Sequence, residues 1–273
     1  MKIFKGFLVT LLANVIVICI CCLIVSFTAN KIFMDSFVKE IVRNELVVSV
    51  SNEFNVTPDQ AEGLFEKEET KQLIDKYTEL TMNGFMGEDS IRDIELGEDL
   101  LQYVKENREY LEEQLDIVIT DQMIQDLEDS EEYKQLTDMY KKIVVEGKTN
   151  MSSEDQGLID AYSFVISWKF QLMLVVIIAV ILLFVALIQK SYYRWIRVLG
   201  ISSIIGAVLT SILALGLKLI VQYAIQDMNM NFNFNISPMI IGCILAGVIG
   251  ILFIVLFVVI QKSQVKREEN FSS

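Results

Sequence analysis

Four long apolar blocks without a charged side chain constrain this chain more than any other feature. They cover residues 6–30, 170–189, 198–217 and 239–261. A bilayer core about 30 Å thick is crossed by about 20 apolar residues in a helix. In lipid, a segment must also satisfy its own backbone hydrogen bonds, which a helix does. Each block is therefore predicted to be a transmembrane helix.

The resulting prediction is an all-α membrane protein with four transmembrane helices. A helical extracytoplasmic domain is inserted between helices one and two. The first block exceeds the apolar core of a cleaved signal peptide, about 7–15 residues, which favours a retained helix. In chain order we expect helix one at 1–30, the extracytoplasmic domain at 31–166, helix two at 168–190, helix three at 196–220, an outer loop at 221–237, helix four at 238–261 and a tail at 262–273.

The basic residues predict the orientation of the chain. Ten Lys and Arg residues lie outside the 31–166 segment, and eight of them share one side if the N-terminus is cytoplasmic. Cytoplasmic loops carry an excess of Lys and Arg. The other two, Lys169 and Lys218, mark the outer ends of helices two and three. We therefore expect a multi-pass protein of the cell membrane with cytoplasmic N- and C-termini.

The 31–166 segment is strongly acidic. It holds 33 Asp and Glu residues against 13 Lys and Arg, a formal charge of −20. Such a surface repels the phosphates of nucleic acid, so no nucleic-acid partner is expected. Cations or a basic partner would be attracted, although solvated helix faces account for many charge runs of this kind.

An internal repeat lies within the acidic segment. Residues 57–84 and 120–147 align without gaps, with ten identities in 28 positions. Each copy begins at a threonine, ends at a glycine and carries an apolar stripe at helical spacing, which predicts a helical unit. The stripe residues are Leu73, Tyr77 and Leu80 in the first copy and Leu136, Tyr140 and Ile143 in the second. The simplest architecture is a helical bundle of two related units.

The outer loop has an unusual alternating pattern. Residues 227–237 alternate asparagine with apolar side chains, a period of two that favours an extended chain. Two interpretations remain open. The loop dips into the lipid interface or covers a pore mouth, or it packs on the outer domain.

Small residues recur every four positions in two of the membrane helices, a spacing that allows close helix approach in lipid. They are Ser202, Gly206, Thr210 and Ala214 in helix three, and Gly242, Ala246 and Gly250 in helix four. Three interpretations are open: packing within the chain, a homo-oligomer seam, or a docking site for a membrane-protein partner.

Polar side chains deep in the membrane blocks are few. Asn14 is the clearest intramembrane polar residue, and Thr10 precedes it by one turn. Polar groups in membrane helices normally avoid lipid. Both residues are therefore expected to face the interior of the helix bundle.

The chain contains none of the patterns that usually carry chemistry. It has no histidine, phosphate loop or metalloprotease motif, and its acidic clusters lack the glycine of a calcium-binding EF-hand loop. No catalytic residue, metal ligand or cofactor is predicted. We expect a non-enzymatic protein, embedded in the lipid bilayer, that binds or senses through its outer domain or serves as an accessory subunit of a membrane complex.

Two alternatives remain. Four membrane helices with a large first outer loop resemble the topology of the FtsX and MacB class of ABC-type transporter membrane subunits. That resemblance implies a transport or mechanotransmitting subunit, but it covers topology alone. No motif is shared, and the chain departs from the class in its short N-terminal tail and short loop between helices two and three. The other alternative is an oligomeric pore lined by the Ser and Thr residues of helix three.

Overall fold

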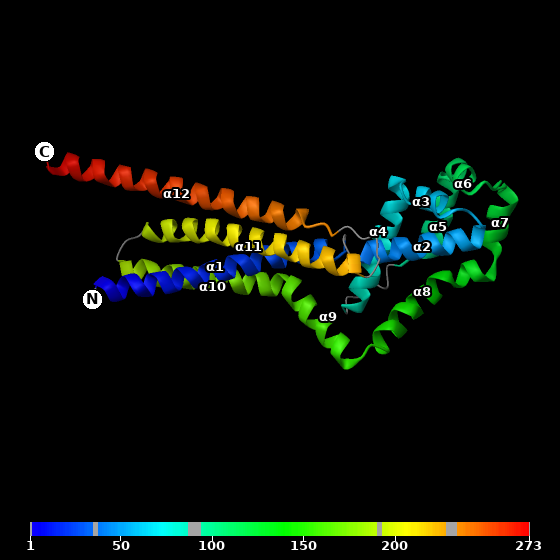
Figure 1. Ribbon diagram of the computed structural model, residues 1–273, viewed down its shortest axis with the longest axis horizontal. Coiled ribbons are helices and arrows are strands. Elements are labelled where there is room, and N and C mark those ends of the chain that lie inside the picture. Colours follow the sequence, from blue (N-terminus) through cyan, green and yellow to red (C-terminus); the bar gives the residue numbers. More distant parts are fainter. Residues whose placement is uncertain (1, 35–37, 87–93, 190–192, 228–233, 273) are drawn as a thin grey trace. The chain divides into compact units, whose positions relative to one another are not determined.

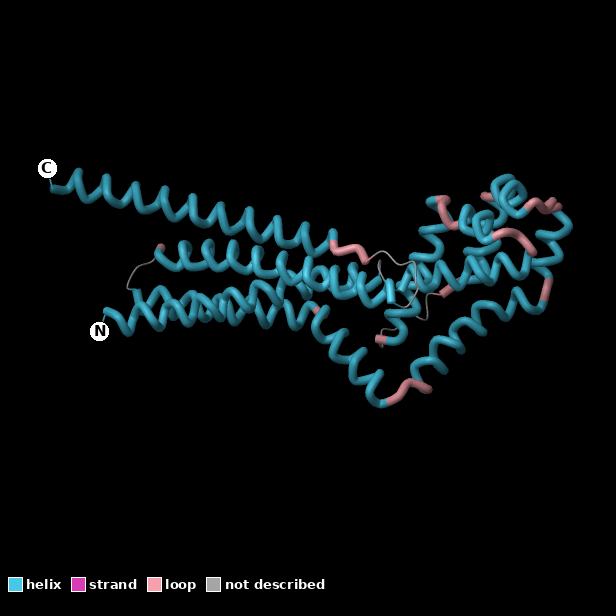
Figure 2. Tube along the Cα trace, in the orientation of Figure 1, coloured by secondary structure: helices cyan, strands magenta, loops and turns pink. Residues whose placement is uncertain are grey.

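The structure is a computed structural model that describes residues 2–34, 38–86, 94–189, 193–227 and 234–272. The described residues form helices joined by short loops and contain no strand (Figure 2), which confirms the predicted all-helical fold class. The chain divides into two compact units, Met1–Phe33 with Phe164–Ser273, and Met34–Ser163. We call them the membrane unit and the acidic unit.

The membrane unit contains four long helices (Figure 1). Each is long and apolar enough to cross a bilayer, which confirms the predicted count. They are α1 (Lys2–Phe33), α10 (Trp168–Gln189), α11 (Arg194–Asp227) and α12 (Ser237–Ser272). The last two extend beyond the predicted bounds because the residues that follow their apolar blocks contain no proline and retain good helix formers such as leucine, lysine and glutamine.

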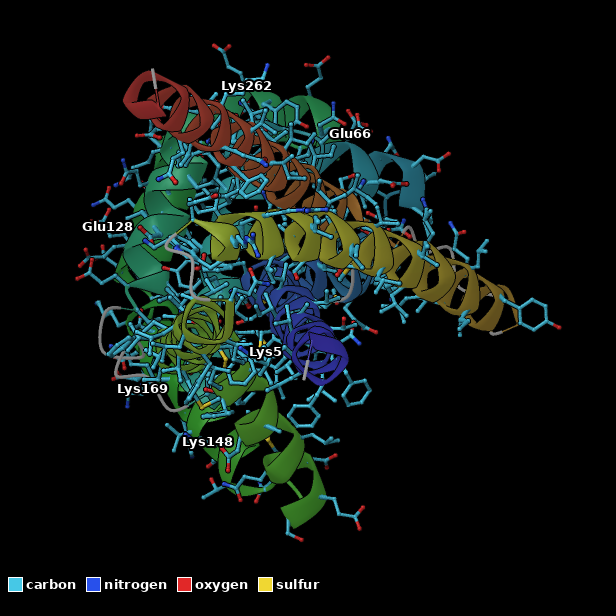
Figure 3. The ribbon with its side chains drawn as sticks, turned by 90° about the vertical axis from the view of Figure 1, so that its left-hand side faces the viewer. Lys5, Glu66, Glu128, Lys148, Lys169 and Lys262 are labelled. Carbon is cyan, nitrogen blue, oxygen red and sulfur yellow. The ribbon has the colours of Figure 1, made fainter. Side chains whose placement is uncertain are left out.

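Helix α1 is the centre of this bundle. It packs against α10, α11 and α12, and the most extensive interface in the unit joins α11 to α12. The buried side chains include Ile16 of α1 and Val185 of α10, both fully buried. Figure 3 looks onto the end of the bundle where Lys5 of α1 and Lys262 of α12 lie.

The acidic unit is built from shorter helices. They are α2 (Lys39–Phe54), α3 (Pro58–Leu64), α4 (Glu68–Phe85), α5 (Leu96–Glu106), α6 (Arg108–Leu115), α7 (Asp121–Asp129), α8 (Glu131–Thr149) and the first part of α9 (Ser153–Ile166). A small apolar core forms where Leu64 of α3 meets Leu111 and Leu115 of α6 and the nearby Ile119.

Both copies of the predicted repeat contain a short helix followed by a long one, α3–α4 and α7–α8. Thr57 and Thr120 cap the short helices, since each side-chain oxygen accepts a hydrogen bond from the backbone N–H three residues later. The repeat-related Tyr77 and Tyr140 meet edge to face, with ring centroids 5.7 Å apart. The hydroxyl of Tyr140 also donates to the backbone oxygen of Tyr77 at 2.9 Å.

Only part of the predicted outer loop lies among the described residues. Residues 228–233, which carry most of the asparagine alternation, lie outside the described residues, as do residues 190–192 of the loop between α10 and α11. Beyond that gap, Phe234 and Ile236 are buried.

Candidate functional site

The predicted small residues of α11 and α12 lie at contacts within the chain. A Cβ added to Gly250 would lie 2.8 Å from the backbone oxygen of Gly200, and one added to Gly200 would lie 2.8 Å from that of Gly250. The two helix backbones therefore touch at this pair. Gly200 was not among the predicted residues because it falls outside the four-residue ladder that begins at Ser202.

Other members of the two ladders face α1 instead. A Cβ on Gly206 would lie 3.0 Å from the side chain of Ile20, and one on Gly242 would lie 3.2 Å from that of Thr28. Ser202 donates a hydrogen bond to the backbone oxygen of Ala13 at 3.3 Å. The ladders thus hold three helices together, with α1 seated against both α11 and α12.

The hydroxyl groups of α11 are used in this packing. Ser202 and Thr210 are each 1% exposed, as is Ala214. Thr210 donates to the backbone oxygen of Gly206, one turn earlier in its own helix, at 2.8 Å. Ala246 is half-buried. Of the serine and threonine ribbon that the pore alternative requires, Ser202, Ser203 and Thr210 are buried within the chain, and Ser211 is half-buried.

Asn14 and Thr10 differ from the expectation that they face the bundle interior. Both are exposed on α1. The buried side of α1 carries Ile16, Val17 and Ile20, because that side fits the small residues of α11. At 100° per residue, Asn14 lies about a third of a turn away from it. Helix rotation depends on the neighbouring helices, so the sequence of α1 alone could not reveal this.

The position of Asn14 is chemically unusual. The middle of the 6–30 apolar block lies four residues away, about 6 Å along the helix. The Thr10 hydroxyl donates a hydrogen bond to the backbone oxygen of Gly6 at 3.1 Å, so this polar group is satisfied within the helix. Among the described residues, no hydrogen bond reaches the amide of Asn14. A bare amide in hydrocarbon costs free energy unless it finds a partner.

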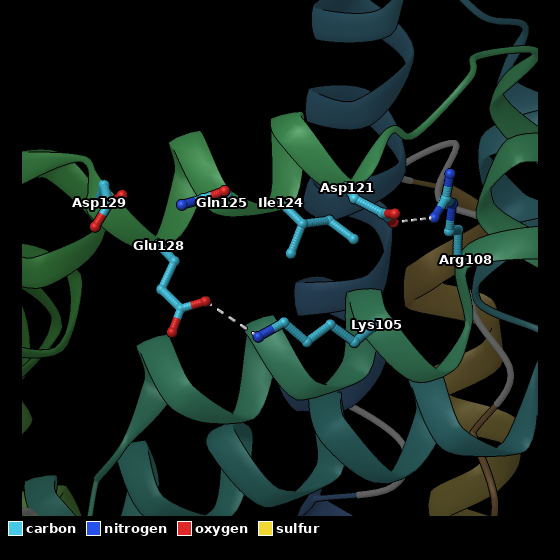
Figure 4. A pocket seen from close by; sticks show the side chains of 7 residues that line it. All are labelled: Lys105, Arg108, Asp121, Ile124, Gln125, Glu128 and Asp129. Atoms are coloured by element: carbon cyan, nitrogen blue, oxygen red, sulfur yellow. Dashed lines mark hydrogen bonds and ion pairs between the residues drawn. The ribbon is translucent and has the colours of Figure 1, made fainter.

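In the acidic unit, a cavity of about 640 Å³ opens between α7 and the junction of α5 and α6 (Figure 4). Two ion pairs border it. Arg108 contacts Asp121 at 2.6 Å, and Lys105 contacts Glu128 at 3.1 Å. Both basic groups of the cavity are thus already paired. Exposed pairs of this kind contribute little stability, about 0–1 kcal/mol.

Helix α7 presents part of its apolar stripe to solvent. Ile124 packs against the small core and lines the cavity. Met123 and Leu127, one turn apart, are 51% and 42% exposed. The repeat-related residue of Leu127 is Leu64, which lies in the core at 5% exposure. The two copies therefore differ in what covers this apolar position.

A polar network joins α4 to α5 in the same unit. Lys76 and Tyr77 both donate to one carboxylate oxygen of Asp99. Burial and the neighbouring carboxylate raise the pKa of Tyr77 far above its usual value. Burial alone would raise the pKa of Asp99, but the hydrogen bonds from Lys76 and Tyr77 outweigh it and leave that pKa below its ordinary value. The network is structural, because each polar group in it is satisfied by a neighbour.

Within the described ranges, no group of three or more Asp, Glu or Cys residues is placed to hold a metal ion. A comparison of the chain with protein-family profiles, curated protein sequences and solved structures gives no match to any of them.

Proposed function

We propose that the protein is a non-enzymatic accessory subunit of a membrane complex in the cell membrane. Its acidic unit is extracytoplasmic and its termini are cytoplasmic. The observation that supports this proposal is the exposed Asn14 in the apolar span of α1. A transmembrane helix of a partner protein would satisfy this amide and remove it from lipid.

The chemistry of the site defines the partner. Hydrogen bonds between membrane helices contribute about 0.6–2 kcal/mol each. The partner helix therefore carries a polar side chain at the depth of Asn14. It packs on the side of α1 that α10, α11 and α12 leave uncovered.

The proposal is tested by affinity purification of the full chain from its native membrane in mild detergent, followed by mass spectrometry. We expect a membrane partner in fixed ratio with the unchanged protein and several-fold less of it with Asn14→Leu. Ile18→Leu is the matched control, since Ile18 is also exposed on α1 but apolar. Equal recovery of the partner with Asn14→Leu would overturn the proposal. A defined homo-oligomer that Asn14→Leu dissociates would instead identify a second copy as the partner.

A second candidate function is protein binding by the acidic unit, and the exposed Met123 and Leu127 of α7 favour it. Exposed apolar residues on a strongly amphipathic helix are typical of surfaces that receive another apolar segment. We expect Met123→Glu to abolish capture of such a partner and Gln122→Glu, a neighbouring exposed position, to leave it unchanged. Capture unaffected by Met123→Glu would rule out this surface.

A further inference from the structure

A second cavity, of about 530 Å³, lies within the membrane unit and is lined by all four of its helices. It is found where α10 ends and α11 begins, the end of the bundle that Figure 3 faces. Its polar lining comes from Gln189 of α10, Arg194 and Arg197 of α11, and Gln261 of α12. Tyr193 and Phe257 supply aromatic walls.

The two arginines have no anionic partner among the described side chains. The Asp and Glu residues of the membrane unit are Asp227, Glu268 and Glu269, whose side chains are outside the description. Arg197 instead lies over the ring of Phe257, 5.9 Å from its centroid, and Tyr193 packs on the same ring at 5.8 Å. Aromatic contacts hold the guanidinium in place without neutralising its charge.

The two arginines also lie at a position on α11 that is unfavourable for cations. Arg194 and Arg197 are three residues apart, so they project from the same side of α11. They stand in its first turns, where the helix dipole disfavours cations, and no acidic residue occupies that first turn. An anion in the cavity would pair with both guanidinium groups and complement the exposed N–H groups of the helix start.

A further polar atom in the cavity wall lacks a partner. The side-chain oxygen of Gln189 is buried, and no described group donates a hydrogen bond to it. A ligand that only accepts hydrogen bonds would leave this oxygen unsatisfied. A ligand that combines an anionic group with hydroxyl donors would satisfy both the arginines and Gln189.

We propose that this cavity binds the headgroup of an anionic phospholipid whose phosphate carries a hydroxyl-bearing substituent such as glycerol. The cavity lies where the apolar spans of α10 and α11 meet the headgroup level, so the acyl chains of such a lipid would extend along the apolar helices. Basic pockets between membrane helices are suited to this headgroup chemistry. The bound lipid would belong to the bilayer leaflet in which the N-terminal end of α1 lies. The inference does not depend on the proposed accessory role.

The experiment uses the full chain in lipid nanodiscs and the fluorescence of Trp195, which is adjacent to Arg194. The other tryptophan is removed by Trp168→Phe. Phosphatidylglycerol with brominated acyl chains is titrated into phosphatidylcholine, and brominated phosphatidylcholine serves as the reference quencher. We expect quenching by the brominated phosphatidylglycerol to saturate at low mole fraction. Arg194→Gln with Arg197→Gln should weaken that apparent affinity by about tenfold or more.

Controls separate the site from general charge and from a soluble ligand. Lys169→Gln with Lys218→Gln removes the same charge elsewhere on the bundle and should leave the affinity unchanged. Equal quenching by both brominated lipids, or full affinity in the double arginine variant, would overturn the proposal. Displacement of the lipid by millimolar soluble glycerol phosphate would also overturn it, because the site would then serve a free phosphate ester. If circular dichroism shows that the double glutamine variant has lost helical structure, Arg194→Lys with Arg197→Lys is used in its place. This lysine variant should retain part of the affinity.

Discussion

At the scale of single residues, the polar network around Asp99 yields a stability prediction. Replacement by asparagine removes the charge that accepts hydrogen bonds from Lys76 and Tyr77. Hydrogen bonds to charged groups contribute about 1.5–3 kcal/mol. We therefore expect Asp99→Asn to lower the free energy of opening of α4 and α5 by about 1–3 kcal/mol. Native-state hydrogen exchange of the full chain in nanodiscs measures this.

The matched control is Glu98→Gln, since Glu98 is exposed on the same helix. It removes an equal charge and should leave the exchange of both helices unchanged. If the two variants behave alike, the loss at Asp99 reflects general charge and not the network.

The buried tyrosines predict alkaline sensitivity. Burial raises the pKa of Tyr77, Tyr103 and Tyr140 above the usual value of 10.0. A group whose pKa is raised in the folded state stabilises that state fully below its unfolded pKa. This contribution is lost as pH rises through the raised folded pKa. The acidic unit should therefore lose stability above about pH 10.

Tyrosinate absorbance of the full chain, followed with pH, tests this prediction. The transition should lie at higher pH for the folded protein than for the chain in concentrated urea, and Tyr140→Phe should reduce the difference. Superimposable titration curves in the two states would contradict it. Asp99 acts in the opposite direction, because its lowered pKa stabilises the unit above about pH 4 and this contribution disappears on acidification.

At the scale of elements, the helix contact at Gly200 and Gly250 is predicted to be intolerant of any side chain. Gly250→Ala would place a Cβ 2.8 Å from a backbone oxygen of α11, so one helix must move. Overpacking of this kind costs about 1–3 kcal/mol. Gly216→Ala is the control, because a Cβ at that position of α11 would meet nothing within 4 Å.

Thermal unfolding in detergent distinguishes the two glycine variants. We expect a lower midpoint for Gly250→Ala and an unchanged or higher one for Gly216→Ala, since alanine also favours the helix. Cysteine pairs across α11 and α12 would report the separation of the helices directly. A Gly250→Ala protein as stable as the unchanged chain would show that the two helix backbones do not touch at this pair.

The membrane helices were predictable because apolar length is a local property of the sequence. The small-residue ladders were also visible, since a four-residue spacing needs no knowledge of the partner. The helices that these small residues contact were not predictable. Gly206 and Gly242 face α1, whereas Gly250 faces α11. The exposure of Asn14 and of Leu127 has the same cause. The rotation of a helix and the burial of its side chains depend on tertiary neighbours, which a periodic sequence pattern does not identify.

At the scale of the whole molecule, charge is divided between the two units. The described side chains of the membrane unit include no carboxylate, whereas the 31–166 segment carries a formal charge of −20 from 33 acidic and 13 basic residues. A highly charged acidic domain is costly to place in lipid, and basic loops favour the cytoplasmic side. This division of charge is the physical basis for the proposed orientation, and the orientation can be measured directly.

The four native cysteines lie in α1 and α12, two of the helices that are apolar enough to cross a bilayer, so single engineered cysteines can report sidedness once those four are replaced. We expect Glu98→Cys to react with a membrane-impermeant maleimide in intact cells. Lys262→Cys, at an exposed position of α12 directly after its apolar block, should react only after permeabilisation. The reverse pattern would place the acidic unit in the cytoplasm. It would also move the arginine cavity to the outer leaflet, where the phospholipid test in nanodiscs remains valid because it does not depend on orientation.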